Sequence, residues 1–228
     1  MAAAFDSDRD AVLAVDIDGA AFEAGIVTPT GSLIDRSSVT PEVDVGPQSH
    51  FSAVAAVVTE QLERAHQHGR EIKAIGVGCE GPIDRNCVTV SPVGVDSWRR
   101  FELREHLADL TGLPVYGDLD AKALALSEGW LGAARGVSSF ATITVSSGVG
   151  GGLVLDGQLL DGATGNAGHF GHIIVEPGGR RCRCGARGCL DAEASGLAIE
   201  TITGRSPREP TYDIMRRTGT LVGRAAGA

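Results

Sequence analysis

A pattern of apolar run, glycine-containing turn and second apolar run occurs twice in this sequence. The two turns are residues 16–20 (DIDGA) and residues 146–152 (SSGVGGG), and each follows a short apolar run that is typical of a buried strand. Two copies of one unit predict a molecule with two similar halves. We therefore expect an N-terminal lobe at residues 1–132 and a second lobe at residues 133–228, and 228 residues suit one large or two small domains.

The first half of the chain has three strand-like runs followed by alternating helices and strands. Apolar residues at helical spacing predict helices at 51–66, 101–110 and 121–131, and apolar runs predict strands at 72–78 and 114–117. This order predicts an α/β fold with a mixed sheet.

The last part of the chain has one more helical pattern, at residues 211–226. Its Ile214, Leu221 and Val222 share roughly one face. A second half that mirrored the first would need further helices and strands, so we expect the C-terminal part of the fold to be truncated. An apolar face without partners favours self-association, and we therefore expect an exposed patch and a homo-oligomer.

Composition and charge exclude several classes of protein. The net charge is −9 and there is no basic block, so direct nucleic acid binding is not expected. No apolar run approaches the roughly 18 residues of a membrane-spanning helix. The first ten residues lack a basic start and an apolar stretch, which predicts no secretory signal. The odd number of cysteines, five, argues for a reducing compartment, and we expect a cytoplasmic protein.

Three cysteines, Cys182, Cys184 and Cys189, lie within eight residues of one another, and His172 precedes them by ten residues. Three thiolates and one imidazole form a closed tetrahedral set that suits zinc. Such a site is structural, because no position remains for water. His169 could bind as well, but only one histidine is needed. The alternative is a set of free cysteines or one disulfide.

Two aspartates follow the strand at 114–117. Asp118 fits a helix N-cap, whereas Asp120 lies where ligand clefts form in layered α/β folds. The two glycine turns offer backbone amides that can hold phosphate oxygens, although hairpins without a ligand have the same pattern. Trp98 suits packing or a platform on which a sugar stacks.

Residues 144–195 resemble the ROK family of sugar kinases and sugar-responsive repressors. They contain, in order, the glycine-rich turn, a Gly-His step and the pattern C-x-C-G-x-x-G-C. The stretch GDLDAKALALSEGW resembles the catalytic stretch of the family, and IGVGCEGPID resembles the strand and Gly-Pro loop beside its sugar site. The resemblance covers about residues 11–226. It implies the actin-like fold of sugar kinases and hsp70, with two lobes around a cleft.

The resemblance implies an ATP-dependent kinase that phosphorylates a hexose or an N-acetylhexosamine, with structural zinc and Mg-ATP as its cofactors. Asp120 would be the general base that takes the proton of the sugar hydroxyl. The implied sugar contacts are Gly81, His169, His172 and Asp191. The implied nucleotide and phosphate contacts are Asp16, Gly19, Ser147, Gly148 and Gly150.

Four positions depart from the family pattern. The first turn, D-x-G-G-T in the family, has Asp18 in place of a glycine and Ala20 in place of the threonine. Two unit charges about 4 Å apart repel by about 1 kcal/mol in water and about 4 kcal/mol at an effective dielectric constant of about 20. Leu119 replaces the asparagine before the catalytic aspartate, and Gly94 replaces a sugar-contacting asparagine. We therefore predict weak nucleotide binding, with sugar binding better preserved.

Two further interpretations remain open from the sequence. The altered first turn is consistent with a non-catalytic, sugar-sensing protein of the repressor branch that lacks its helix-turn-helix. It is also consistent with an inactive relative that keeps a folded zinc core.

Overall fold

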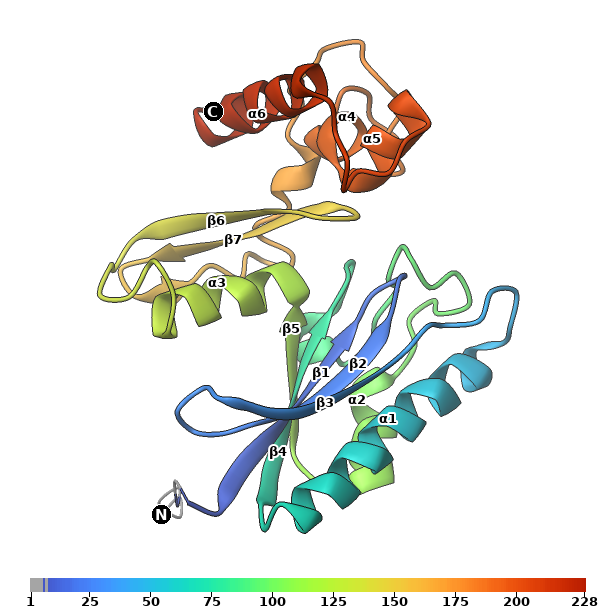
Figure 1. Ribbon diagram of the computed structural model, residues 1–228, viewed down its shortest axis with the longest axis vertical. Helices are drawn as coiled ribbons and strands as arrows, with labels where there is room; N and C mark the ends of the chain where they lie inside the picture. The colour runs from blue at the N-terminus through green and yellow to red at the C-terminus, as the bar shows by residue number, and fades with distance from the viewer. Residues whose placement is uncertain (1–5, 7) are drawn as a thin grey trace. The chain divides into compact units, whose positions relative to one another are not determined.

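The computed structural model describes residue 6 and residues 8–228, and Figure 1 shows the course of the chain. The predicted absence of a secretory signal concerns the first ten residues, most of which lie outside the described part.

The chain forms two compact units. The described residues up to Ala123 and Asp161–Asn166 make up unit 1, and Leu124–Leu160 and Ala167–Ala228 make up unit 2. We predicted the division after residue 132, whereas the chain leaves unit 1 inside helix α3 (Asp120–Trp130). The reason is that α3 starts directly after a strand of unit 1, while Gly129 near its end lies against Phe140 of unit 2.

Among the described residues, unit 1 is built on a mixed sheet of five strands in the order β3-β2-β1-β4-β5. Strands β2 and β3, on one side of the sheet, are antiparallel to their neighbours, whereas β1, β4 and β5 run parallel. This confirms the predicted α/β class with a mixed sheet. The strands are β1 (Asp10–Ile17), β2 (Phe22–Val27), β3 (Leu33–Val39), β4 (Glu71–Cys79) and β5 (Val115–Leu119).

Two helices pack on this sheet, α1 (Pro47–Gln67) against β2 and β3, and α2 (Leu103–Thr111) against β5. Helix α1 begins before the predicted residue 51, because Pro47 suits the first turn of a helix. Its apolar face is buried as the spacing predicts, and Val54 and Val58 are fully covered. Each such side chain contributes about 1.5–3 kcal/mol through burial.

Trp98 is a packing residue of unit 1. Its side chain has no exposed surface, and its ring stacks on Phe101 and Phe22 with centroid distances of 4.5 and 5.8 Å. The indole Nε1 donates a hydrogen bond of 3.0 Å to the carbonyl oxygen of Pro47. A buried indole with its N–H satisfied in this way offers no face to a sugar.

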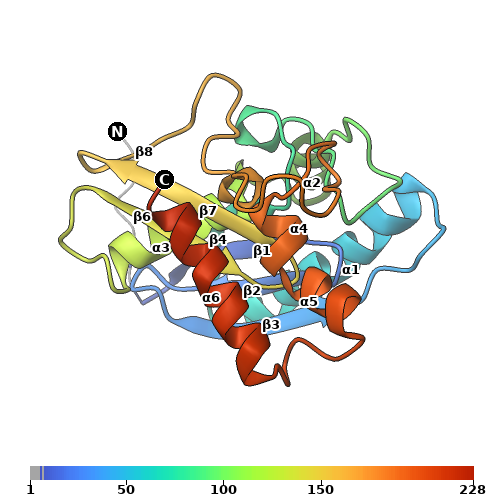
Figure 2. The same ribbon diagram turned by 90° about the horizontal axis from the view of Figure 1, so that it is seen from above.

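Unit 2 combines a small antiparallel sheet with helices on its C-terminal side (Figures 1 and 2). Helix α6 runs alongside α4. The strands are β6 (Phe140–Val145), β7 (Val149–Leu155) and β8 (Gln158–Leu159), and the helices are α4 (Leu190–Ala194), α5 (Gly196–Thr203) and α6 (Tyr212–Ala226).

The second glycine turn is shorter than predicted. It spans only Ser146 to Gly148, and Gly150, Gly151 and Gly152 belong to β7, where they pair with β6. Gly151 lies so close to the ring of Phe170 that a side chain would collide with it. These glycines therefore serve close packing on the strand, which has the same sequence signal as a turn.

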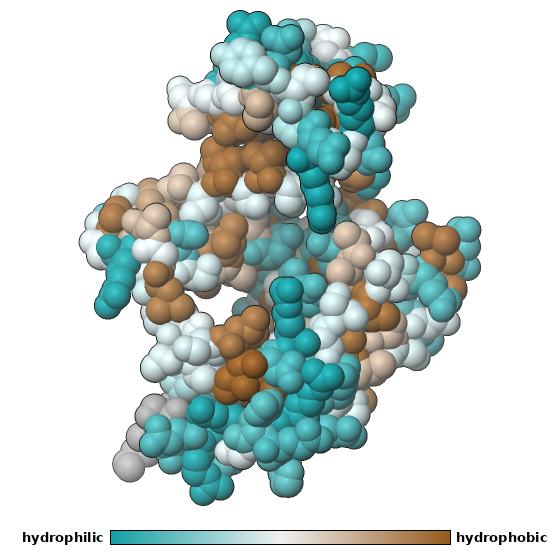
Figure 3. Space-filling view, in the orientation of Figure 1, coloured by the Kyte–Doolittle hydropathy of each residue, from teal (hydrophilic) through white to brown (hydrophobic). Residues whose placement is uncertain are grey.

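The predicted exposed face of α6 is wrong. Leu221 is buried with Val175, Leu190 and Ala194, and Val222 packs against the same cluster. The partners come from the loop and helix that precede α6, a contact that helical spacing alone does not reveal. On the face drawn in Figure 3, hydrophobic residues lie in separate areas among hydrophilic ones. The apolar face of α6 thus gives no support to a homo-oligomer.

No helix in the part of the chain that the structure describes has both the length and the apolar character needed to cross a membrane.

The two tryptophans provide a test of the unit 1 core. Trp98→Ala is expected to lower the free energy of unfolding by about 3–5 kcal/mol, because it removes the centre of an aromatic stack. Trp130→Ala, which changes a side chain that is half exposed, is the matched control and should cost less than about 1 kcal/mol. Urea unfolding followed by circular dichroism measures both, and equal losses would contradict the assigned role of Trp98.

Candidate functional site

Three carboxylates lie where three parallel strands of unit 1 end. Asp16 is the second-last residue of β1, Glu80 follows β4, and Asp120 follows β5. Asp16 pairs with Gly78 in the register of the sheet. A Cβ at Gly78 would lie 3.3 Å from Asp16 Oδ1 and 3.4 Å from Asp120 Cα, so both aspartates lie beside this glycine. The carboxyl edge of a parallel sheet is where layered α/β folds bind ligands.

This edge carries a negative electrostatic field. Burial, followed by the charges of Asp120, Asp18 and Glu23, raises the pKa of Asp16 to about 6. A carboxylate under such repulsion is stabilised by a cation. Glu80 was not among the residues that sequence reasoning selected. Its position directly after a strand, as for Asp120, is the signal that would have found it.

Asp118 is not the N-cap that we expected. It lies in β5, and α3 begins two residues later, at Asp120. The Oδ1 atom of Asp118 lies 2.7 Å from the Nζ of Lys122, which is 1% exposed. The expectation failed because the carboxylate of Asp118 forms an ion pair with Lys122, four residues later, instead of capping the helix. This spacing of opposite charges was visible in the sequence.

The first turn is closed by its own carboxylate. Asp18 Oδ1 accepts hydrogen bonds of 2.7 Å from the backbone amides of Ala20 and Ala21. Backbone amides of a glycine turn are the groups that would hold phosphate oxygens. In this chain Asp18 therefore occupies donors that an incoming anion would need, in addition to repelling it.

Gly94 and Gly19 are in close contact. A Cβ at Gly94 would lie 2.5 Å from Gly19 Cα and 2.7 Å from Glu80 Oε2. The amide of Gly94 donates a hydrogen bond of 2.8 Å to the same Glu80 atom. A side chain at position 94 would collide with the backbone of Gly19. The glycine that replaces the family's asparagine therefore packs directly against the altered first turn and Glu80.

The second turn is held by Asp191, which was predicted as a sugar contact. Asp191 Oδ1 accepts a hydrogen bond of 2.9 Å from the amide of Val149. The carbonyl oxygens of Ser146 and Ser147 accept hydrogen bonds from the amides of Gly196 and Leu197, at the start of α5. The structure thus brings together Asp191, Ser147 and Gly148, while Gly150 lies in β7.

The other predicted sugar contacts lie on loops of each unit. In unit 1, the carbonyl oxygen of Gly81 accepts a hydrogen bond of 3.2 Å from Val93. In unit 2, His169 precedes the short 3₁₀ helix η2 (Phe170–His172) and His172 is its last residue. Their rings stack with centroids 5.7 Å apart.

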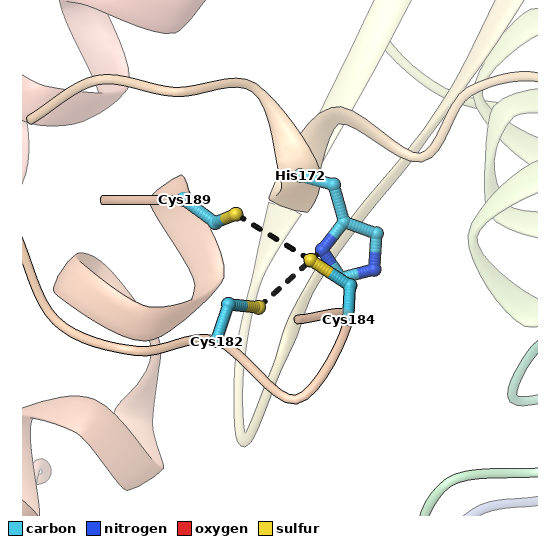
Figure 4. Close-up of side chains that lie close together, drawn as sticks. All are labelled: His172, Cys182, Cys184 and Cys189. Atoms are coloured by element: carbon cyan, nitrogen blue, oxygen red, sulfur yellow. Dashed lines mark hydrogen bonds between the residues drawn. The ribbon is translucent and has the colours of Figure 1, made fainter. Parts of the chain in front are cut away.

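The four predicted metal ligands form a cluster in unit 2 (Figure 4). One ligand atom each from His172, Cys182, Cys184 and Cys189 lies within 4.8 Å of the others. The Sγ atoms of Cys184 and Cys189 are 3.7 Å apart, and Cys182 Sγ is 3.7 Å from His172 Nδ1. Zinc–sulfur bonds of about 2.3 Å in a tetrahedron place two sulfurs about 3.8 Å apart. The donor set and its spacing therefore fit zinc.

The disulfide alternative does not fit. All five cysteines are free, and the 3.7 Å between Cys184 and Cys189 is far longer than a disulfide bond of about 2.05 Å. Burial, followed by contact with the other two thiols, raises the pKa of Cys189 to about 12. Three thiolates at this spacing need a cation to offset their mutual repulsion.

The loop that carries the cysteines is anchored on both sides. Gly188 has φ +76° and lies against the carbonyl oxygen of Glu176, where a side chain would collide. The buried Glu193 accepts a hydrogen bond of 2.6 Å from the amide of Arg180 and pairs with Arg217 of α6 at 2.5 Å. These contacts hold the loop at Glu176 on one side and at α6 on the other.

Comparison with known proteins identifies the family. The ROK family profile matches residues 12–220. The chain belongs to the ROK family. The resemblance seen in the sequence is thereby confirmed.

Two curated relatives show what ROK proteins of this similarity do. A glucokinase from Thermotoga maritima is 36% identical over 190 residues, which cover 82% of this chain and 58% of the relative. An N-acetylmannosamine kinase from Escherichia fergusonii is 35% identical, with 82% and 62% covered. The chain thus spans about three fifths of the length of these relatives.

A solved structure shows the same fold. The ROK family glucokinase from Streptomyces griseus, in complex with glucose and AMPPNP, superposes with a TM-score of 0.74 at 32% identity. The match covers 85% of this chain and 62% of that one. The predicted actin-like α/β fold is therefore confirmed, and at the level of the family this is a sugar kinase fold.

The metal site has a direct test. Chain purified without added metal is expected to contain one zinc, and Cys184→Ser should lose it on dialysis against a chelator, because three ligands hold zinc more weakly than four. Cys87→Ala, which changes a buried cysteine of unit 1, is the matched control and should keep its zinc. Elemental analysis decides; a zinc content near zero in the unchanged chain would contradict the assignment.

Proposed function

We propose that this chain phosphorylates a sugar hydroxyl from ATP, with Asp120 as the general base. The observation that carries the proposal is the position of Asp120 at the carboxyl edge of the unit 1 sheet, beside Asp16, in a chain of the ROK family. The relatives are named glucokinase and N-acetylmannosamine kinase, which supports a hexose or an N-acetylhexosamine as the substrate.

The proposed reaction is a single phosphoryl transfer. Asp120 accepts the proton of the sugar hydroxyl while the hydroxyl oxygen forms a bond to the γ-phosphorus of ATP. The bond from that phosphorus to the bridging oxygen breaks, and ADP leaves. The products are the sugar phosphate and ADP, and the proton passes from Asp120 to solvent.

The remaining roles follow the family pattern. Mg²⁺ bound with the nucleotide neutralises phosphate charge, and Asp16, with its raised pKa, is a carboxylate that suits a divalent cation. Free thiols support the cytoplasm as the proposed location. The proposed sugar contacts are Gly81, His169, His172 and Asp191, and the proposed phosphate contacts are Gly19, Ser147, Gly148 and Gly150.

We also propose that this chain binds nucleotide weakly. Asp18 accepts hydrogen bonds from the amides of Ala20 and Ala21, and its charge lies in the turn where a phosphate would bind. A sugar hydroxyl carries no charge, so the same carboxylate does not repel it. Sugar affinity is therefore expected to exceed nucleotide affinity.

The general base is tested by one isosteric change. Asp120→Asn is expected to lower kcat at least about 100-fold, because the amide cannot accept the hydroxyl proton. Sugar affinity should change only a few-fold, since the amide keeps the shape of the carboxylate. An assay of ADP release with glucose and with N-acetylmannosamine measures the rate. Asp109→Asn, on an exposed part of α2, is the control. Equal rates for both variants would show that Asp120 is not the base.

The first turn is tested by restoring the family residues. Calorimetric titration of the unchanged chain with Mg-ATP is expected to give no binding in the micromolar range. Asp18→Gly combined with Ala20→Thr should raise the affinity at least about tenfold, because it frees two amides and removes a repulsion of about 1–4 kcal/mol. Ala20→Thr alone keeps the carboxylate and should restore little. Micromolar binding by the unchanged chain would contradict the proposal.

The closed first turn also favours a second candidate, a sugar-sensing protein without catalysis. The same titrations separate the two functions. Sugar binding without Mg-ATP binding, in the unchanged and the restored chain alike, supports sensing. Binding of neither ligand supports an inactive relative with a folded zinc core.

A further inference from the structure

Lys122 is the most completely buried charged side chain near Asp120. It is fully buried, and its Nζ lies 2.7 Å from Asp118 Oδ1, 2.8 Å from Asp161 Oδ1 and 3.2 Å from the carbonyl oxygen of Gly165. An ammonium group has three N–H donors, and here each has an acceptor. Removing the ammonium group from water costs free energy, so these partners have to offset its charge.

The partners of Lys122 come from two distant parts of the sequence. Asp118 precedes α3, whereas Asp161 and Gly165 belong to the segment 161–166, which follows β8 and returns to unit 1. The ammonium therefore fastens this returning segment to the first turn of α3. Asp118 is 27% exposed and Asp161 53% exposed, so the lysine is the buried centre of the arrangement.

The same segment is also fastened to the Gly-Pro loop, near both of its ends. The Asn166 side chain accepts the amide of Ile83 at 3.1 Å and donates to the carbonyl oxygen of the same residue at 2.8 Å. Arg85 donates a hydrogen bond of 2.8 Å to the carbonyl oxygen of Gly162. Ile83 lies two residues after Gly81. The segment 161–166 therefore connects α3, which begins with the proposed general base Asp120, with the loop that carries a proposed sugar contact.

We propose that Lys122 is a positioning residue for the sugar: by holding the segment 161–166 between the start of α3 and the Gly-Pro loop, it fixes Gly81 relative to Asp120. This inference rests on the proposed sugar kinase function. Lys122 touches neither substrate in this account; it acts through the backbone of the segment it holds. Without its charge, Asp118 and Asp161 lose their shared partner and the segment is released.

The test uses the whole chain and two readouts. Lys122→Met removes the ammonium, and Asp161→Asn weakens the contact from a side chain that is half exposed, so the fold is retained even if the first variant fails to fold. Asp161→Glu keeps the charge. Lys73→Met is the matched control, because Lys73 pairs with Asp10 and Glu71 at the surface of unit 1. Calorimetry measures glucose and N-acetylmannosamine binding, and hydrogen exchange measures the Ile83 amide and the amides of residues 161–166.

Sugar affinity is expected to fall about tenfold in Lys122→Met and about threefold in Asp161→Asn, on the scale of a charge-assisted hydrogen bond. The Ile83 amide should exchange faster in both, whereas Asp161→Glu and Lys73→Met should remain close to the unchanged chain. A purely structural role would lower the melting temperature while leaving sugar affinity unchanged, and that result overturns the proposal.

The readouts separate this inference from the proposed function. Exchange that does not change in Lys122→Met and Asp161→Asn, with sugar binding intact, overturns the role of Lys122 alone. If the unchanged chain binds neither sugar, the proposed function fails and with it the role in sugar binding, while faster exchange in the two variants still supports the tether itself.

Discussion

The parallel pairing of β1, β4 and β5 is the constraint on which the rest of unit 1 depends. Because these strands run in one direction, their carboxyl ends meet at one edge and bring Asp16, Glu80 and Asp120 together. Gly78 keeps the space between the two aspartates open. A slip of one residue in the register of β4 would place a side chain there and turn the alternate faces of the strand over.

The negative charge at this edge explains why we expect the sugar and the nucleotide to bind with different affinities. Asp16, Asp18, Glu80 and Asp120 are all acidic, and burial, followed by the charges of Asp120, Asp18 and Glu23, raises the pKa of Asp16. Lys122 offsets part of the negative charge near this edge, because it pairs with Asp118. A neutral sugar can donate hydroxyl hydrogen bonds to carboxylates, which are acceptors only, whereas nucleotide phosphates meet repulsion unless a divalent cation accompanies them.

Local spacing allowed the sequence to predict the cluster of His172 with three cysteines and most helices and strands. The four candidate ligands lie on one loop and one short helix, so their meeting depends on few long-range contacts, and β4 (Glu71–Cys79) extends only one residue beyond the predicted strand at each end. Long-range pairing was what the sequence did not reveal. The partners of Trp98, the cover over Leu221 and the contact between Lys122 and Asp161 join segments far apart in the chain.

The loop that carries the three cysteines connects the candidate metal site to other parts of unit 2. Its Cys189 immediately precedes α4, whose Asp191 accepts the amide of Val149 at the second turn, and His172 lies at the other end of the cluster beside His169. One ion bound at this point would therefore fix a proposed sugar contact and the proposed phosphate turn together. The anchoring of the loop through Glu193 and Arg217 makes α6 part of the same arrangement. A structural metal bound there would act on both proposed binding surfaces of unit 2 without touching the sugar or the nucleotide.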